Sequence, residues 1–229
     1  MDITELKRKL EQVKKTGWVV SRRRGNTGVG YTLELLLGIK ENNLNTPDFG
    51  DIELKSQRKE ASNRITMFTF NRAVWKIRQK ELIEKYGYID STGRKALYCT
   101  VNTKPNTQCL FLKVENDKLR LYHVDKTLIA EWNIDDLVKT FREKMPAVVV
   151  VMADTRINSE EKEEFYFNEA YLLKNPDINN FIDLIKKDII IVDVRMYLKK
   201  NGTVRNHGTA FRIDEKYLYL CFADKERLI

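Results

Sequence analysis

The spacing of apolar residues predicts two helices in the first quarter of the chain. Residues 2–15 carry apolar side chains at helical intervals, with charged residues between them. These apolar positions are Ile3, Leu6, Leu10 and Val13. Gly17 ends this helix, and residues 31–43 have the pattern of a second helix that Gly38 kinks or ends. A short apolar segment and a basic, glycine-rich loop, "WVVSRRRGNTGVG", separate the two helices.

After Pro47 the pattern changes from helical spacing to alternation. In "FGDIELKSQ", Ile52 and Leu54 point to one side of the chain, and Glu53 and Lys55 point to the other. This pattern predicts a strand with one polar face.

A second strand is predicted at residues 64–71, and the two strands are expected to form a hairpin or to be neighbours in one sheet. Asn71 is expected to cap a helix that runs to about Tyr86.

The remainder of the chain mixes strands and helices. Strands are predicted at residues 95–101, 109–116, 118–125, 147–153, 163–173, 188–198 and within 209–222. The four valines of 147–153 make that strand apolar on both faces, which is typical of a central position in a sheet. Asn133 is expected to cap a helix at 134–144, and Pro176 opens a helix at 177–187. The mixture predicts an α/β or α+β fold with a mixed sheet.

The composition favours a packed, basic protein. The 229 residues suffice for one large domain or two interlocked lobes, and 42% of them are hydrophobic. Lys plus Arg number 41 against 33 Asp plus Glu, so the net charge of +8 favours polyanionic partners, nucleic acid first. The three widely spaced cysteines form neither a disulfide framework nor a C-x-x-C zinc pair, which suits a reducing cytosol. The charged N-terminus does not have the pattern of a signal peptide, and the longest apolar run is too short for a bilayer.

The loop "GNTGVGYT" is one residue short of a phosphate-binding P-loop. Gly25, Gly30 and Thr32 match that pattern, but Tyr31 takes the place of its lysine. A tyrosine cannot offset the charge of the β and γ phosphates, and three arginines separate the first glycine from the apolar segment before it. Asp154, after the four-valine strand, is the candidate for a Walker B aspartate. We expect a glycine-rich turn rather than a site of ATP hydrolysis.

The stretch "PDFGDIELKSQ" carries the stronger chemical signal. Asp48, Glu53 and Lys55 follow the order Pro-Asp, a short spacer, then Glu-x-Lys. Hydrolysis of a phosphodiester needs a divalent cation, and Mg²⁺ is held by one or two carboxylates together with waters. Glu53 and Lys55 share a strand face, so Lys55 can position or deprotonate an attacking water beside the metal. The backbone carbonyl of Leu54 offers a further ligand.

Glu-x-Lys by itself has little specificity. Copies at residues 5–7 and 160–162 are better explained as solvated charges. The copy at 53–55 differs because it combines an alternating strand, an upstream Pro-Asp pair and a nearby glycine-rich loop; an exposed strand with an ordinary salt bridge is the alternative. Glu34, within the apolar "TLELLLG", either lies on the wet face of its helix or reaches a metal or Lys55.

Two segments of the chain resemble one nuclease family. "GNTGVGYTLELLLGIKENNLNTPDFGDIELKSQ" resembles the catalytic segment of MvaI/BcnI-type restriction endonucleases, which are similar to the mismatch-repair nicking enzyme MutH. "VDVRMYLKKNGTVRNHGTAFRI" is similar to the C-terminal D-x-R and H-G-T-A-F-R block of that family. The resemblance implies a PD-(D/E)xK restriction-endonuclease-like fold, with a mixed central sheet flanked by helices and two lobes around a DNA cleft.

The resemblance also implies roles for the residues of the motif. Asp48 and Glu53 correspond to the metal ligands, Lys55 to the catalytic lysine, and Glu34 to the helix glutamate that supports the active site. The implied cofactor is Mg²⁺, with Mn²⁺ as a substitute and Ca²⁺ as an ion that supports binding without cleavage.

The C-terminal block lies in the recognition lobe of that family. Here it offers Asp193, Arg195, His207 and Arg212 for reading bases, since Arg can contact guanine in two places and Asp can accept from cytosine. Asp193 and Arg195 share a strand face, so Asp193 alternatively orients Arg195; a surface salt bridge and a loop hydrogen bond are the plain structural explanations. Other basic residues are expected to contact phosphates, with solvation as the alternative. These residues are Arg22, Arg23, Arg24, Lys199, Lys200 and Arg205.

The expected function is that of a type II restriction endonuclease. Its expected partner is double-stranded DNA. A companion DNA methyltransferase is expected in the same prokaryotic-type cytoplasm, with no direct complex implied, and no membrane is expected. A monomer would nick each strand in turn, with a catalytic lobe mainly in residues 1–160 and a recognition lobe mainly in 161–229, or with interwoven lobes. A MutH-like enzyme that nicks one strand and a non-catalytic DNA-binding protein on the same fold are the alternatives.

Overall fold

The computed structural model describes residues 2–39, 52–60, 64–70 and 74–229. They form two compact units that interleave along the chain. Unit 1 comprises Met1–Asn63, Met145–Asp177 and Leu218–Ile229, and unit 2 comprises Arg64–Lys144 and Ile178–Tyr217. Both units draw on residues from either side of position 160. The assignment of a catalytic and a recognition lobe stays a prediction.

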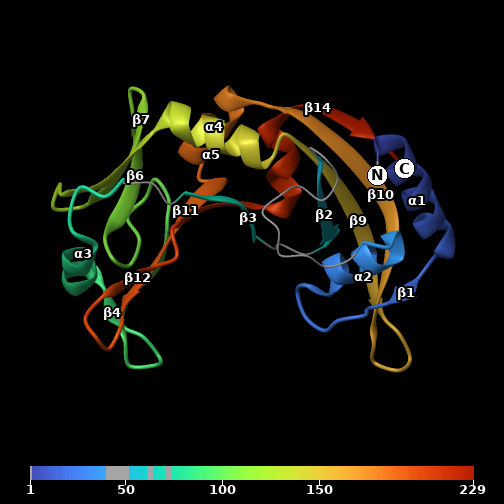
Figure 1. The fold of residues 1–229 in the computed structure, drawn as a ribbon, viewed down its shortest axis with the longest axis horizontal. Coiled ribbons are helices and arrows are strands. Elements are labelled where there is room, and N and C mark those ends of the chain that lie inside the picture. The colour runs from blue at the N-terminus through green and yellow to red at the C-terminus, as the bar shows by residue number, and fades with distance from the viewer. Residues whose placement is uncertain (1, 40–51, 61–63, 71–73) are drawn as a thin grey trace. The chain divides into compact units, whose positions relative to one another are not determined.

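Unit 1 is built around a five-stranded sheet with the order β1-β10-β9-β2, in which β14 also pairs with β10 (Figure 1). Its strands are β1 (Val19–Val20), β2 (Ile52–Arg58), β9 (Ala147–Ile157), β10 (Glu163–Pro176) and β14 (Phe222–Arg227). β2 runs parallel to β9, and the other pairs are antiparallel. β9 lies between β10 and β2, which confirms the central position predicted from its valines.

The hairpin expected for the strands at 49–57 and 64–71 is wrong. β2 pairs with β9 in unit 1, whereas β3 (Arg64–Phe70) pairs with β13 in unit 2. Alternation identifies a half-buried strand but does not identify the sheet that buries it. Leu54 of β2 packs into the core of unit 1, and Phe68 of β3 is buried in unit 2.

Two helices, α1 (Ile3–Thr16) and α2 (Gly28–Leu37), pack against one face of the unit 1 sheet (Figure 1). Their apolar side chains form one cluster with those of β2, β9 and β10. This cluster includes Leu6, Leu10, Leu33, Leu37, Leu54, Val149, Val151, Phe165 and Phe167. α1 confirms the helix predicted at 2–15. α2 ends at Gly38, which has a φ of 74°, as the sequence indicates, but it begins three residues earlier than predicted.

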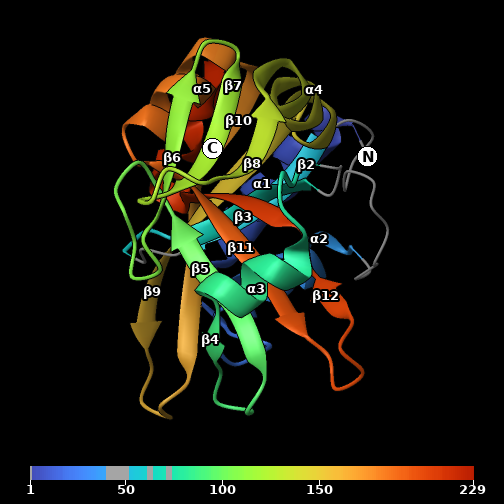
Figure 2. The ribbon, with the colours of Figure 1, turned by 90° about the vertical axis from the view of Figure 1, so that its left-hand side faces the viewer.

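Unit 2 contains a six-stranded antiparallel sheet with the order β3-β13-β11-β5-β4, in which β12 pairs with β11 (Figure 2). Its further strands are β4 (Tyr88–Ile89), β5 (Lys95–Val101), β11 (Ile190–Leu198), β12 (Val204–Asn206) and β13 (Thr209–Asp214). A separate three-stranded sheet consists of β6 (Leu110–Glu115), β7 (Lys118–His123) and β8 (Leu128–Asn133). The helices are α3 (Gln79–Tyr86), α4 (Ile134–Lys144), α5 (Ile178–Lys186) and the 3₁₀ helix η1 (Glu215–Cys221), which straddles the unit boundary.

Two helix caps predicted in unit 2 have different outcomes. Asn71 lies outside the described residues, and α3 begins only at Gln79, so the helix is shorter than predicted. Asn133 caps α4 as predicted, because its Oδ1 accepts from the backbone N–H of Asp135 at 2.9 Å. The sequence did not predict β8. The mixed α+β character is confirmed, and no helix in the described ranges is long and apolar enough to cross a membrane.

Candidate active site and DNA-recognition residues

Glu53 and Lys55 lie together on β2, as the strand alternation predicts. Lys55 Nζ donates to Glu53 Oε1 at 2.5 Å, and the two side chains are 34% and 23% exposed, respectively. β2 ends the strand order of the unit 1 sheet, so the pair lies on the last strand rather than in the middle of the sheet. A carboxylate and an ammonium are thus held in contact where solvent reaches both.

The second acidic residue of the motif, Asp48, lies outside the described residues. Within the described ranges, no three His, Cys, Asp or Glu side chains gather as a metal site. This does not conflict with Mg²⁺ chemistry, because that ion keeps several waters and needs only one or two carboxylates. Glu53 fits one such ligand, since its carboxylate is partly exposed. Leu54 buries its side chain, and the role of its carbonyl stays a prediction.

The polar row that begins with Glu53 and Lys55 continues to Gln57 on the same face of β2. Lys59 follows two residues later, directly after the strand ends at Arg58, and the sequence analysis singled out neither residue. Gln57 is only 6% exposed. The signal was present in the sequence, because the alternation of β2 extends beyond the Glu-x-Lys motif.

Lys59 ties this row to the two neighbouring strands. Its ammonium lies 3.0 Å from Asp154 Oδ1 on β9 and 2.7 Å from Glu169 Oε1 on β10. Burial lowers the pKa of Lys59, but the hydrogen bonds to these two carboxylates outweigh it and raise the pKa overall. The hydrogen bond from Lys59 lowers the pKa of Glu169 in turn. Asp154, the Walker B candidate, is therefore held in an ion pair.

Glu34 lies on α2, one helical turn after Gly30. Its Oε1 would be 3.9 Å from a Cβ placed on Gly30, and the Ser56 hydroxyl of β2 would be 3.6 Å from the same Cβ. The carboxylate of Glu34 therefore lies on the side of α2 that faces β2. Its part in catalysis stays a prediction.

The glycine-rich stretch forms a tight turn into α2 rather than a P-loop. β1, which precedes it, is a two-residue strand paired only with β10 among the described strands. Gly25 has a φ of 81°, and α2 begins at Gly28. Tyr31, which takes the lysine position, lies under Arg23, whose guanidinium carbon is 3.9 Å from the ring centroid. The geometry supports the glycine-rich turn that the sequence analysis preferred.

The arginines of this turn line a hollow of about 540 Å³ in unit 1. Its lining consists of Ser21, Arg22, Arg23, Arg24, Gly25, Ile157, Glu160, Glu161, Lys162 and Glu163. Arg58 fixes the two walls to each other, because it donates to both carboxylate oxygens of Glu163 and to the carbonyl of Gly25. Arg22 and Arg24 are exposed, as phosphate contact would require, but the glutamates opposite reduce the positive potential.

In unit 2, Asp193 orients a different arginine from the one considered in the sequence analysis. Asp193 is 8% exposed, and its Oδ2 accepts from Arg212 Nη1 at 2.8 Å. Its Oδ1 accepts from the Thr100 hydroxyl at 2.7 Å. Arg195 shares the strand face of Asp193, but its Nε is buried without a hydrogen-bond partner in the described part of the chain. Asp193 thus holds Arg212 rather than Arg195.

His207 and two tyrosines form an aromatic group beside Arg195. The ring centroids of Tyr98, Tyr197 and His207 lie 6.1–6.4 Å apart, and the backbone N–H of His207 donates to the Arg195 carbonyl at 2.9 Å. Arg94 lies over the Tyr197 ring at 4.2 Å. His207 itself is exposed, so its ring edge is accessible. The tyrosines were missed because aromatic residues in strands usually signal packing.

The remaining basic residues of the C-terminal block lie on or near a turn. Lys199 and Lys200 are exposed, and the turn is closed by a hydrogen bond from the Lys199 N–H to the Thr203 carbonyl at 2.8 Å. Arg205, on β12, is exposed as well. The geometry leaves all three side chains accessible and does not decide between phosphate contact and solvation.

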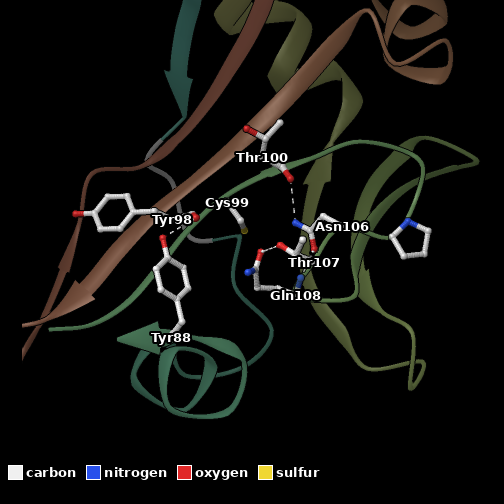
Figure 3. A pocket seen from close by; sticks show the side chains of 8 residues that line it. Tyr88, Tyr98, Cys99, Thr100, Asn106, Thr107 and Gln108 are labelled. Atoms are coloured by element: carbon white, nitrogen blue, oxygen red, sulfur yellow. Dashed lines mark hydrogen bonds between the residues drawn. The ribbon is translucent and has the colours of Figure 1, made fainter. Parts of the chain in front are cut away.

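A hollow of about 780 Å³ adjoins the recognition candidates in unit 2 (Figure 3). It is lined by Tyr88, Tyr98, Cys99, Thr100, Pro105, Asn106, Thr107 and Gln108. The Tyr88 hydroxyl donates to the Tyr98 carbonyl at 3.2 Å, and Asn106 Nδ2 donates to the Thr100 carbonyl at 2.9 Å. None of the lining residues is an acidic or basic residue. Thr100, which lines the hollow, donates its hydroxyl hydrogen bond to Asp193.

Comparison with known proteins identifies one family. The sequence profile of the MvaI/BcnI restriction endonuclease family matches residues 7–222. The solved complex of restriction endonuclease MvaI with its cognate DNA substrate is 27% identical, has a TM-score of 0.75, and is matched over 100% of both chains. MvaI in the absence of DNA is also 27% identical, with a TM-score of 0.63 over 100% of this chain and 99% of that one. No curated protein matches the chain. These matches confirm the PD-(D/E)xK restriction-endonuclease-like fold.

Proposed function

Since the chain belongs to the MvaI/BcnI restriction endonuclease family, it is a type II site-specific deoxyribonuclease, and we propose that it hydrolyses double-stranded DNA at a short site with Mg²⁺ as its cofactor. The family implies a divalent metal, and the choice of Mg²⁺ rests on the motif's carboxylates. The observation that carries the catalytic assignment is the contact between Glu53 and Lys55 on β2, at 2.5 Å.

In this proposal, Asp48 and Glu53 hold the metal, together with the carbonyl of Leu54. Bound Mg²⁺ supplies positive charge against the phosphorane-like transition state and activates water. Lys55 places its ammonium beside the scissile phosphate, where it donates to a phosphate oxygen or orients the attacking water. Glu34 supports this group from α2.

Recognition of the site is proposed for unit 2. Arg212 is proposed as a base contact whose guanidinium is held in place, because its Nη1 donates to Asp193 and its Nη2 donates to the Arg64 carbonyl. Arg195 and His207 are proposed as further base contacts. Phosphate contacts are proposed for basic side chains on both units, namely the exposed Arg22, Arg24, Lys199, Lys200 and Arg205 and the half-buried Arg23.

The proposed mode of cleavage rests on the single catalytic motif that the sequence analysis identified. A monomer with one active site would nick each strand in turn, whereas a MutH-like enzyme would stop after the first nick. The proposed partner is double-stranded DNA, as in the MvaI complex, and the proposed setting is a prokaryotic-type cytoplasm with a companion DNA methyltransferase.

The test is a plasmid cleavage assay with Mg²⁺, using Lys55→Ala as the active-site variant. Lys113→Ala is the matched control, because Lys113 also pairs with a glutamate two residues away on a strand, at 2.7 Å. Lys55→Ala is expected to abolish cleavage while DNA binding, measured with Ca²⁺, persists. Lys113→Ala should cut like the wild type.

The distribution of products separates the alternatives. Discrete linear fragments support the restriction endonuclease, and a nicked circle that never becomes linear supports MutH-like nicking. Shifted but intact DNA with the wild-type protein and Mg²⁺ would mean a binding protein without catalysis. Undiminished cleavage by Lys55→Ala would refute the catalytic assignment.

A further inference from the structure

Gln57 is buried, and its side-chain amide has no hydrogen-bond partner among the residues that the structure describes. The residue is 6% exposed, yet no hydrogen bond to its side-chain amide is formed within the described part of the chain. Among the described residues, some side-chain polar atoms have neither solvent contact nor a hydrogen-bond partner. Ser56 Oγ is one of them, but the amide atoms of Gln57 are not. The small exposed area of Gln57 therefore includes its amide.

The neighbours of Gln57 on the sheet cannot satisfy this amide. On β2, Lys55 is held by Glu53, and Lys59, just beyond the end of β2, is held by carboxylates on β9 and β10. Across the sheet, the register partner of Gln57 is Met152, whose thioether is only a weak acceptor. By strand alternation the amide lies on the same face as Lys55, and none of these three described neighbours accepts a hydrogen bond from it.

The position of Gln57 suits a contact with the phosphate that Lys55 addresses. Residues two apart on one strand face lie about 6.6 Å apart, so their side chains can converge on one phosphate group. Non-bridging phosphate oxygens are acceptors only and gain charge in the transition state, which favours an N–H donor over another carboxylate. We propose that Gln57 is a further substrate-contacting residue, whose amide donates to a non-bridging oxygen of the scissile phosphate. This inference rests on the proposed active site at Glu53 and Lys55.

The first measurement compares the single-turnover cleavage rates of the wild type and Gln57→Leu on a duplex that carries the mapped site. Leucine keeps a similar volume and removes both donors, so the fold should be preserved. Loss of a hydrogen bond to a charged group predicts a rate roughly 10- to 100-fold slower. The melting temperature and the DNA affinity in Ca²⁺ should remain those of the wild type, which a merely structural role of Gln57 would not allow.

The second measurement replaces each non-bridging oxygen of the scissile phosphate with sulfur, one diastereomer at a time. If the amide contacts one of these oxygens, the effects of the sulfur and of Gln57→Leu will not be additive for that diastereomer. The other diastereomer is the matched control, and its effect should add to that of the substitution. Additive effects for both diastereomers, or a Gln57→Leu rate within twofold of the wild type, would overturn the inference.

The outcomes distinguish this inference from the proposed function. If the wild type cuts, Lys55→Ala does not cut, and Gln57→Leu cuts normally, only the role of Gln57 fails. If the wild type does not cut DNA, or Lys55→Ala cuts normally, the proposed active site fails and the role of Gln57 fails with it.

Discussion

The first turn of α2 gives a sharp test of the geometry, because its two glycines, Gly28 and Gly30, differ in the space around them. A Cβ on Gly28 would lie 2.3 Å from the backbone oxygen of Arg23 and 2.8 Å from the Ser21 hydroxyl. A Cβ on Gly30 would lie 3.6 Å from its nearest neighbour, the Ser56 hydroxyl, which is an ordinary contact. We therefore expect Gly28→Ala to destabilise the protein and Gly30→Ala to be tolerated.

The expected loss of stability in Gly28→Ala follows from the shift that the added Cβ forces on the Arg23 carbonyl. Restoring an ordinary contact at Gly28 shifts the Arg23 carbonyl by roughly 1 Å, a displacement of the kind that overpacking forces on the backbone. That carbonyl accepts from the Ser21 hydroxyl at 2.7 Å, and the adjacent Arg22 N–H donates to Thr32 Oγ1 at 2.9 Å. Losing one or two such bonds, at about 1 kcal/mol each, and overpacking the turn predict a loss of about 1–3 kcal/mol.

Gly30→Ala is expected to stabilise the protein by up to about 1 kcal/mol, because alanine favours the helix interior over glycine. Thermal melting is a sufficient assay, since each kcal/mol corresponds to about 2–4 °C in a chain of this size. The Gly28→Ala variant should melt below the wild type, and Gly30→Ala should melt at or above it. Equal losses for the two variants, or no loss for Gly28→Ala, would refute the reasoning.

Two further predictions concern the ion pairs described above. The pKa of Glu169 is lowered by Lys59, so this pair stabilises the fold above the ordinary pKa of 4.5 and loses its effect as the pH falls through the lowered value. Melting profiles should therefore show Glu169→Gln below the wild type at neutral pH, with the gap closing in acid; a constant gap would contradict this. Asp193→Asn replaces an acceptor with an amide donor facing Arg212 or Thr100, so we expect about 1–3 kcal/mol lower stability in urea unfolding. It should also relax discrimination against DNA sites with one altered base pair, and unchanged discrimination would argue against the orienting role of Asp193.

The sequence predicted the elements of this fold better than their partners. The helix at 2–15 and the strand at 49–57 were predicted from periodicity, because burial of one face leaves a regular record in the chain. The strand at 147–153 was predicted from its unbroken apolar run, because both of its faces are buried. The hairpin was predicted wrongly because nothing within two alternating segments specifies which sheet covers them. The start of α3 was missed for a similar reason, since the segment before it is irregular and Trp75 forms a bridge to Ala130 on β8.

The candidate site shows the same division between local and long-range information. The contact of Glu53 with Lys55 follows from strand geometry alone, and the structure has them 2.5 Å apart. The partner of Asp193 could not be predicted in this way, because Arg212 reaches it from a different strand. Either Arg195 or Arg212 could pair with Asp193 as far as the sequence shows. The pairing of β11 with β13 places Arg212 within reach of it.

The interleaving of the two units along the chain constrains how such an enzyme can change. The backbone passes from one unit to the other after Asn63, Lys144, Asp177 and Tyr217. No single cut in the gene therefore separates the parts, and a fragment from either end would carry incomplete sheets. Exchange of one gene segment with a relative cannot transfer either unit without also transferring part of the other. If unit 2 reads the DNA as proposed, new specificity is expected to arise by point substitutions within it rather than by shuffling of domains.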